Sequence, residues 1–149
     1  NSTLRLTYGK VSPLPKDPRN DAKENYYTTL KGTVKKFVDD DPEFDLPQGL
    51  IDLYEAKDFG PYADDDGYMP VNFLTNNDIT GGNSGSPVLN GNGELIGLAF
   101  DGNIEAMAGD VIFDDKLQKT INVDIRYVLF LIDKYAGAKH IVDEMTVIK

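Results

Sequence analysis

Residues 80–88, with the sequence Thr-Gly-Gly-Asn-Ser-Gly-Ser-Pro-Val, decide the fold that we expect for this chain. A serine flanked by glycines is typical of a nucleophile loop, because the negative oxygen that develops during acyl transfer must meet backbone amides already fixed in place. Glycines at 81, 82 and 85 allow backbone conformations that a side chain would block. We therefore interpret Ser84 as a catalytic nucleophile, with the backbone amides of Gly82 and Ser84 as its oxyanion hole.

The residues that follow the serine favour β-structure. Pro87 suits the start of a strand, where a missing N–H is tolerated, and Asn-Gly-Asn-Gly at 90–93 is a strong hairpin signal between apolar segments. A second strand is expected at 94–100. This order resembles the second barrel of chymotrypsin-like peptidases, so the expected fold is mostly β: the second barrel of a chymotrypsin-like (trypsin-like) double β-barrel, with a C-terminal helix.

Other apolar patterns predict the rest of the elements. The segments expected to be strands are 4–8, 26–30, 71–75, 111–113 and 120–123. The segments expected to be helices are 47–57, 125–135 and 139–145, and they lie at the periphery. The aspartates at 64–66 lack the ligand spacing of a calcium loop and are interpreted as a solvated loop.

The chain contains one histidine, His140, and it follows Ser84 in the sequence. In chymotrypsin-like folds the base and its orienting aspartate precede the serine. An α/β-hydrolase elbow would allow a later histidine, but Ser86 occupies the last glycine position of that motif. We interpret His140 as a solvent-exposed residue. Either the base lies on sequence outside this chain or there is no catalysis.

Composition excludes several classes of function. The chain has 149 residues and a formal charge of −10, which disfavours nucleic-acid and membrane partners and attracts cationic groups such as peptide amino termini. It has no cysteine, so disulfides and thiolate metal sites are excluded. Because it lacks an initiator Met and a signal-peptide core, we expect an excised or processed piece of a longer protein.

Three blocks of the sequence, 81–88, 97–103 and 123–129, together resemble one family. It is that of the bacterial serine dipeptidyl-peptidases of the dipeptidyl-peptidase 7 and 11 types, and the likeness is greatest to type 7. The resemblance implies a double β-barrel with an inserted helical domain, and release of dipeptides from free peptide N-termini. It also implies a location in the periplasm or at the cell surface of a Gram-negative bacterium. Residues 1–149 would be the C-terminal part of the peptidase domain.

The resemblance also assigns roles to substrate-binding residues. Asp101 would face the α-ammonium group of the substrate, Gly102 would form a wall of the primary specificity pocket, and Phe100 would contact the substrate beside them. Relatives that cut after aspartate or glutamate carry arginine at the position of Gly102. Glycine leaves volume for an apolar side chain, so a preference for non-acidic, mainly hydrophobic residues before the cut bond is implied.

The expected partners are oligopeptides with free N-termini and the first barrel of the same polypeptide. Whether the longer protein forms a homodimer is left open. No cofactor or metal is expected. Because the family's histidine, aspartate and helical domain are missing here, we expect the chain alone to be inactive. A non-catalytic peptide-binding or assembly module on the same barrel is the alternative, and a metal-dependent hydrolase is a more distant one.

Overall fold

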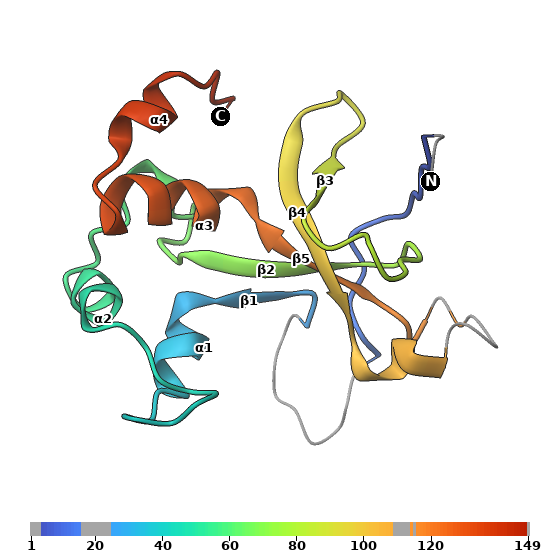
Figure 1. Cartoon of the computed structure of the whole chain (residues 1–149), viewed down its shortest axis with the longest axis horizontal. Helices are drawn as coiled ribbons and strands as arrows, with labels where there is room; N and C mark the ends of the chain where they lie inside the picture. The colour runs from blue at the N-terminus through green and yellow to red at the C-terminus, as the bar shows by residue number, and fades with distance from the viewer. Residues whose placement is uncertain (1–3, 16–24, 109–113, 115, 149) are drawn as a thin grey trace. The chain divides into compact units, whose positions relative to one another are not determined.

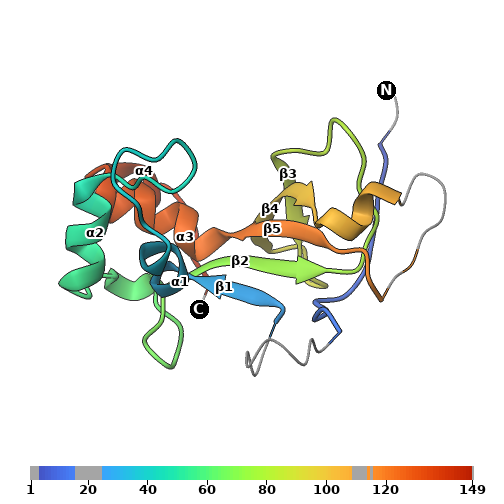
Figure 2. The same ribbon diagram turned by 90° about the horizontal axis from the view of Figure 1, so that it is seen from below.

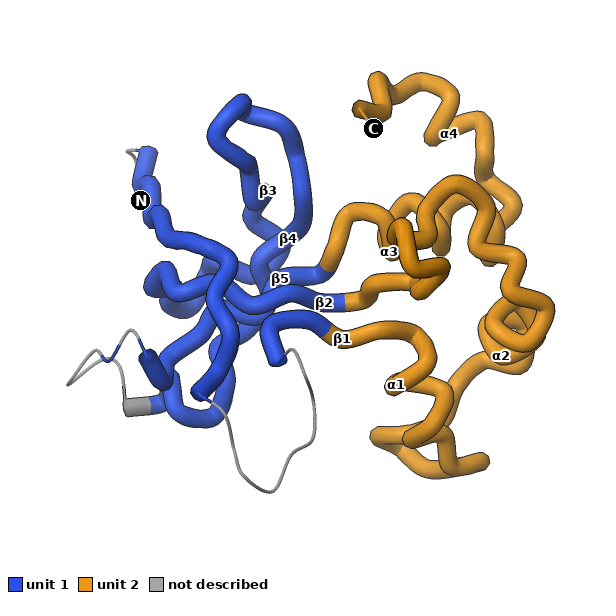
Figure 3. Tube along the Cα trace, turned by 180° about the vertical axis from the view of Figure 1, so that it is seen from behind, with its two compact units in different colours: residues 1–27, 72–123 blue, residues 28–71, 124–149 orange. Residues whose placement is uncertain are grey.

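The computed structural model describes residues 4–15, 25–108, 114 and 116–148 (Figure 1). The chain forms two compact units, coloured separately in Figure 3. The first comprises Asn1–Tyr27 and Asn72–Val123, and the second comprises Thr28–Val71 and Asp124–Lys149. The predicted strand at 111–113 lies outside the described residues.

Among the described residues, the strands form a five-stranded antiparallel sheet with the order β1-β2-β5-β4-β3. Their bounds are β1 (Tyr27–Thr29), β2 (Pro70–Thr75), β3 (Ser86–Leu89), β4 (Leu95–Gly102) and β5 (Thr120–Asp124). The predicted hairpin is confirmed, because β3 pairs with β4 and the turn closes with the Asn90 amide donating to the Glu94 carbonyl over 3.0 Å. In Figure 2 the long strand β4 continues from this hairpin into a short helical turn.

Short helices occupy more of the chain than expected. Their bounds are α1 (Leu30–Lys35), α2 (Gln48–Glu55), η1 (Gly60–Tyr62), η2 (Ile104–Ala108), α3 (Ile125–Phe130), the π-helix η3 (Leu131–Tyr135) and α4 (Lys139–Asp143). The expected mostly-β barrel is thus confirmed only in part. The described strands form an open sheet, and the structure is mixed, since the helices carry much of the second unit.

The predicted strand at 4–8 is wrong. Its apolar side chains are almost fully exposed: Leu4 is 96% exposed and Tyr8 is 89% exposed. Alternation predicts a strand only where another strand supplies hydrogen bonds, and among the described residues such pairing begins at the bridge between Val11 and Thr75. Residues 4–8 therefore have the alternating sequence pattern of a strand but no partner strand among the described residues.

In the first unit, the sheet depends on a close approach of β4 and β5. A Cβ atom at Gly97 would lie 2.6 Å from the Val123 carbonyl oxygen and 2.8 Å from Cε1 of Phe73. Asn122, which is 1% exposed, adds a polar tie: its Nδ2 donates to Thr75 Oγ1 over 2.9 Å. Glycine at 97 and asparagine at 122 thus fix how tightly the strands meet.

The second unit has a core of its own. Phe59 and Phe130 meet edge to face, with ring centroids 6.1 Å apart. The Tyr62 hydroxyl donates to Asp133 Oδ2 over 2.8 Å. Burial, and then this hydrogen bond, raise the pKa of Tyr62 to about 12.

The start of helix α3 is fixed by Asp124. Its carboxylate accepts from the Arg126 amide over 2.9 Å and pairs with the Arg126 guanidinium.

The Gly97 contact gives the first prediction. Gly97→Ala should lower the free energy of unfolding by about 2 kcal/mol or more, because a backbone oxygen cannot move away as a flexible side chain can. Gly91→Ala is the matched control, since nothing lies within 4 Å of a Cβ there, and it should change the free energy by less than about 0.5 kcal/mol. Urea unfolding measures both, and equal effects would contradict the described strand approach.

Candidate active site

The loop between β2 and β3 carries Ser84 at an exposed position two residues before β3 begins. Asn83 and Thr80 close it with a reciprocal pair of bonds: the Asn83 amide donates to the Thr80 carbonyl over 3.1 Å, and the Thr80 amide donates to Asn83 Oδ1 over 2.9 Å. The Asn83 carbonyl in turn accepts from the Ser86 amide over 2.9 Å. The backbone on both sides of the serine is therefore fixed from within the loop.

Two glycines flank the serine for a conformational reason. Gly82 has φ of 97° and Gly85 has φ of 82°, both in the left-handed region that L side chains rarely adopt. Two such residues around Ser84 turn the chain sharply and present the serine at the surface. The expected need for glycine at these positions is consistent with this geometry.

Two hydrogen bonds attach the loop to strand β4, and their acceptors are the backbone carbonyls of consecutive residues. The Gly85 amide donates to the Ala99 carbonyl over 2.7 Å, and the Ser84 hydroxyl donates to the Phe100 carbonyl over 3.0 Å. A peptide carbonyl accepts a hydrogen bond but is far too weak a base to remove the serine proton. The hydrogen bond to Phe100 thus holds the hydroxyl in place but does not activate it.

The residues after Phe100 follow Ser84 along the same strand. Asp101 is exposed, and its Oδ1 accepts from the Gly102 amide over 2.8 Å. Phe100 has 47% of its surface exposed. An exposed carboxylate fixed to its own strand can pair with a cation through a charge-assisted hydrogen bond. The structure therefore brings Ser84 to Phe100 and places Asp101 and Gly102 directly after that contact.

The volume expected beside Gly102 is not empty. A Cβ atom built at Gly102 would lie 2.9 Å from the Cβ of Ala106 in η2. The Ala106 methyl group therefore already fills the Cβ side of Gly102, and a side chain at 102 would require η2 to shift. This neighbour could not be predicted from the sequence, because η2 has no periodic apolar pattern that would indicate a helix.

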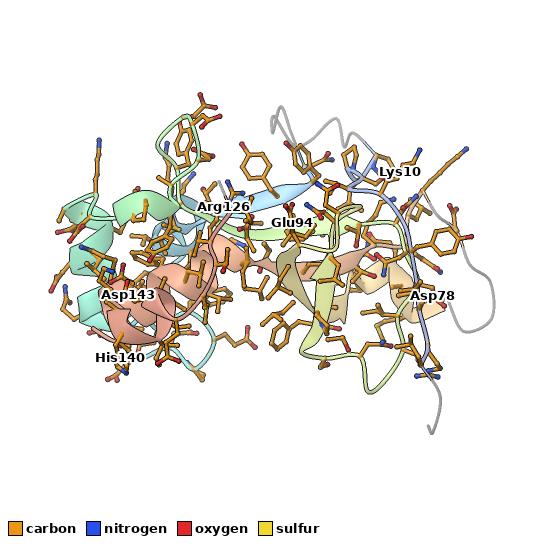
Figure 4. All side chains as sticks on the ribbon, turned by 90° about the horizontal axis from the view of Figure 1, so that it is seen from above. Lys10, Asp78, Glu94, Arg126, His140 and Asp143 are labelled. Carbon is orange, nitrogen blue, oxygen red and sulfur yellow. The ribbon has the colours of Figure 1, made fainter. Side chains whose placement is uncertain are left out.

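His140 lies on α4 in the second unit, where Figure 4 labels it, and its side chain is exposed, as predicted.

In the described part of the chain, no group of three or more His, Asp or Glu side chains is arranged to hold a metal ion. None of the helices among these residues combines the length and apolar character that a membrane span requires.

Two side-chain clamps were not predicted from the sequence. Asn83 belongs to the serine motif, and its Oδ1 accepts a hydrogen bond from the Thr80 amide. Asn103 follows Gly102, and its Oδ1 accepts from the Lys119 amide over 2.7 Å. Asparagine next to glycine or serine in a turn is a signal for such side chain–backbone bonds, and it could have indicated both clamps.

Comparison with known proteins places this geometry in one family. The family model described as Peptidase S46 matches residues 1–147. The chain is 71% identical to dipeptidyl-peptidase 7 of Capnocytophaga gingivalis over 150 aligned residues, covering 100% of this chain and 21% of that protein. It is 53% identical to an Asp/Glu-specific dipeptidyl-peptidase of the same organism, covering 100% of this chain and 21% of that one.

The solved structures agree with the sequence relatives. The crystal structure of Porphyromonas endodontalis DPP11 in complex with the dipeptide Arg-Glu matches with a TM-score of 0.88 and 46% identity. The match covers 95% of this chain and 20% of that one. The chain thus spans about a fifth of the length of the relatives that it matches.

The Asn83 clamp gives a prediction for the loop. Asn83→Ala removes the acceptor of the Thr80 amide, so hydrogen exchange at that amide should accelerate by about fivefold, as loss of a hydrogen bond worth about 1 kcal/mol implies. Asn83→Asp keeps an acceptor oxygen at the same place and should retain most of the protection. If Asn83→Ala leaves exchange at Thr80 unchanged, the side chain does not hold the loop.

Proposed function

The chain belongs to the peptidase S46 family, and from that premise we propose that it is the nucleophile-bearing segment of a serine dipeptidyl-peptidase. The enzyme would release dipeptides from the free amino ends of oligopeptides. The observation that supports this most is the Ser84 loop: an exposed serine between left-handed glycines, tied to β4 through Ala99 and Phe100.

In the proposed reaction, Ser84 Oγ attacks the carbonyl carbon of the second substrate residue, and the hydroxyl proton passes to a base. The carbonyl oxygen becomes negative and accepts hydrogen bonds from the amides of Gly82 and Ser84. Collapse of this intermediate breaks the peptide bond, and the base returns the proton to the leaving amine. Water then releases the dipeptide from Ser84 by the reverse sequence of steps.

The base is the part that this chain does not supply in our proposal. No histidine precedes Ser84, and the relatives are about five times longer than this chain. We assign the base and its orienting aspartate to another part of the same polypeptide. The present chain would then be the second barrel of a chymotrypsin-like double barrel, completed by a first one.

In our proposal Asp101 determines that a dipeptide is released. A substrate bound by its free α-ammonium group at a fixed carboxylate can place only one peptide bond at Ser84, because chain length from the amine sets the reach. The backbone bond from the Gly102 amide to Asp101 Oδ1 orients that carboxylate. An anionic chain, with a formal charge of −10, also favours a cationic substrate end.

Gly102 supports a preference for non-acidic, mainly hydrophobic residues before the cut bond. Glycine offers no positive charge to a substrate carboxylate, whereas burial of an apolar side chain contributes about 1.5–3 kcal/mol. The relatives include dipeptidyl-peptidase 7 and an Asp/Glu-specific dipeptidyl-peptidase, and the latter is the less similar of these two to this chain. Location in the periplasm or at the cell surface of a Gram-negative bacterium stays a prediction.

The nucleophile is tested by covalent labelling. The full-length polypeptide should react with a fluorophosphonate at Ser84, and Ser84→Ala should abolish both labelling and dipeptide release. The 149-residue chain alone should not be labelled, since loss of the base removes most of the catalytic power of a serine triad, about 10⁶-fold in subtilisin. A full-length polypeptide that binds peptides but is not labelled would instead support a non-catalytic peptide-binding module.

The role of Asp101 is tested by an isosteric change. Asp101→Asn keeps the oxygen that accepts from the Gly102 amide but removes the charge, so kcat/KM for free-amine substrates should fall by about a hundredfold. N-acetylated substrates, already poor, should change little. Asp39→Asn, at an exposed position of the second unit, is the control. Equal losses on both substrate types would show that Asp101 serves folding.

A further inference from the structure

We propose that Asn103 is a positioning residue for substrate binding: it fixes the end of β4 so that the Asp101 carboxylate is held where the α-ammonium group of the substrate arrives. The inference rests on the proposed function, because the amine-binding role of Asp101 belongs to that function. Asn103 is half-buried and stands between β4, which ends at Gly102, and η2, which begins at Ile104. It would act through Asp101 and would not itself contact substrate.

Asn103 continues the pairing of β4 with β5 one residue past the end of β4. The two strands are hydrogen-bonded neighbours in the sheet. Beyond β4, the Asn103 amide donates to the Lys119 carbonyl over 3.0 Å, and the Lys119 amide donates to Asn103 Oδ1 over 2.7 Å. Opposite residues of an antiparallel pair exchange two such bonds, and here a side-chain oxygen replaces one backbone carbonyl. The residue after Gly102 is therefore tied to the residue before β5.

The other polar groups of Asn103 also have partners. Its Nδ2 donates to the Leu117 carbonyl over 2.7 Å and to Glu105 Oε2 over 2.6 Å. Its backbone carbonyl accepts from the Ala106 amide over 2.9 Å in the first turn of η2. A side-chain amide supplies two N–H donors and an acceptor oxygen, whereas an ionised carboxylate has no donor. An asparagine can thus make this set of bonds, and the set fixes its side chain in one orientation.

Gly102 is the joint through which Asn103 would act on Asp101. The Gly102 amide donates to Asp101 Oδ1 over 2.8 Å, so the orientation of this amide sets that of the carboxylate. The next peptide group, between Gly102 and Asn103, is held by the bond from the Asn103 amide to the Lys119 carbonyl. Glycine has more backbone freedom than any other residue. Without the bonds of Asn103, the Gly102 amide and the carboxylate that it orients would turn more freely.

Asp101 therefore lies between two fixed points of the chain. Before it, the Phe100 carbonyl accepts from the Ser84 hydroxyl over 3.0 Å, and after it comes the Asn103 clamp. In our proposal a dipeptide must span from the Asp101 carboxylate to Ser84, and small displacements of a bound group reduce rates strongly. Loss of the second fixed point should weaken recognition of the amine while the nucleophile keeps its place.

The first measurement compares a free-amine dipeptide substrate with its N-acetylated counterpart in the full-length polypeptide. Asn103→Ala should lower kcat/KM for the free-amine substrate by about tenfold, mainly through KM, because the ammonium group is held in the bound substrate as well as in the transition state. The N-acetylated substrate has no ammonium group and should change by less than about twofold. Asn92→Ala, at an exposed position of the β3–β4 turn, is the control and should change neither. Equal losses on both substrates would overturn the inference.

The second measurement is a double-mutant cycle with Asp101→Asn. If Asn103 acts through Asp101, then adding Asn103→Ala to Asp101→Asn should lower kcat/KM for the free-amine substrate by less than about twofold, because the charge that Asn103 positions is already absent. Losses that multiply in the double variant would show that Asn103 supports the fold independently of Asp101, and they would overturn the inference.

The third measurement needs no activity. Asn103→Ala removes the acceptor of the Lys119 amide, so hydrogen exchange at that amide should accelerate by about fivefold or more. Unchanged exchange would show that the side chain does not hold the end of β4, and it would overturn the inference.

A milder variant combines Asn103→Asp with Glu105→Gln, which keeps the net charge and an oxygen for the Lys119 amide. It should show the same selective loss on the free-amine substrate with a smaller magnitude. It replaces Asn103→Ala in both kinetic measurements if Asn103→Ala does not fold, and an equal loss on both substrates would again overturn the inference.

Failure of the proposed function has a separate signature. If Ser84→Ala still releases dipeptides at the rate of the unmodified polypeptide, the reaction does not use this site, and the inference is overturned together with the proposed function. If Ser84→Ala is inactive but Asp101→Asn affects both substrates equally, Asp101 does not bind the amine, and the inference is overturned while the nucleophile stands. If Asp101→Asn is selective and Asn103→Ala is not, only the inference about Asn103 fails.

Discussion

The attachment of the serine loop to strand β4 is the constraint on which the rest of this account depends. Two bonds form it, from the Gly85 amide to the Ala99 carbonyl and from the Ser84 hydroxyl to the Phe100 carbonyl. Because the acceptors are consecutive residues of one strand, they fix both the place and the direction of the loop. A serine on an unattached loop would have no defined position relative to the proposed substrate-binding residues of β4.

The strand that holds the serine also carries the proposed recognition groups. Asp101 and Gly102 come directly after Phe100, so both proposed substrate-binding residues lie on the same strand that accepts the hydrogen bond from Ser84. Rigid strands place groups more accurately than loops do, which matters because small displacements reduce rates strongly. The position of β4 is also set by β5, because the missing side chain at Gly97 allows the two strands to lie close together.

Much of this arrangement could be predicted from the sequence, for local reasons. The glycines around Ser84 and the Asn-Gly turn at 90–93 specify backbone conformations within a few residues, and the hairpin has the expected place. The strand predicted at 4–8 was wrong because alternation cannot show whether a partner strand exists. The contact of Ala106 in η2 with Gly102 at the end of β4 was missed because neither residue type indicates it by itself.

In the proposed reaction Ser84 forms the covalent bond with substrate while β4 holds the other end of the dipeptide. A crystal structure of the full-length polypeptide treated with a dipeptidyl phosphonate would show whether both occur. We predict a bond from Ser84 Oγ to phosphorus, a phosphonyl oxygen in reach of the Gly82 and Ser84 amides, and the inhibitor's amine at Asp101. An adduct on another residue, or an inhibitor bound away from β4, would contradict the account.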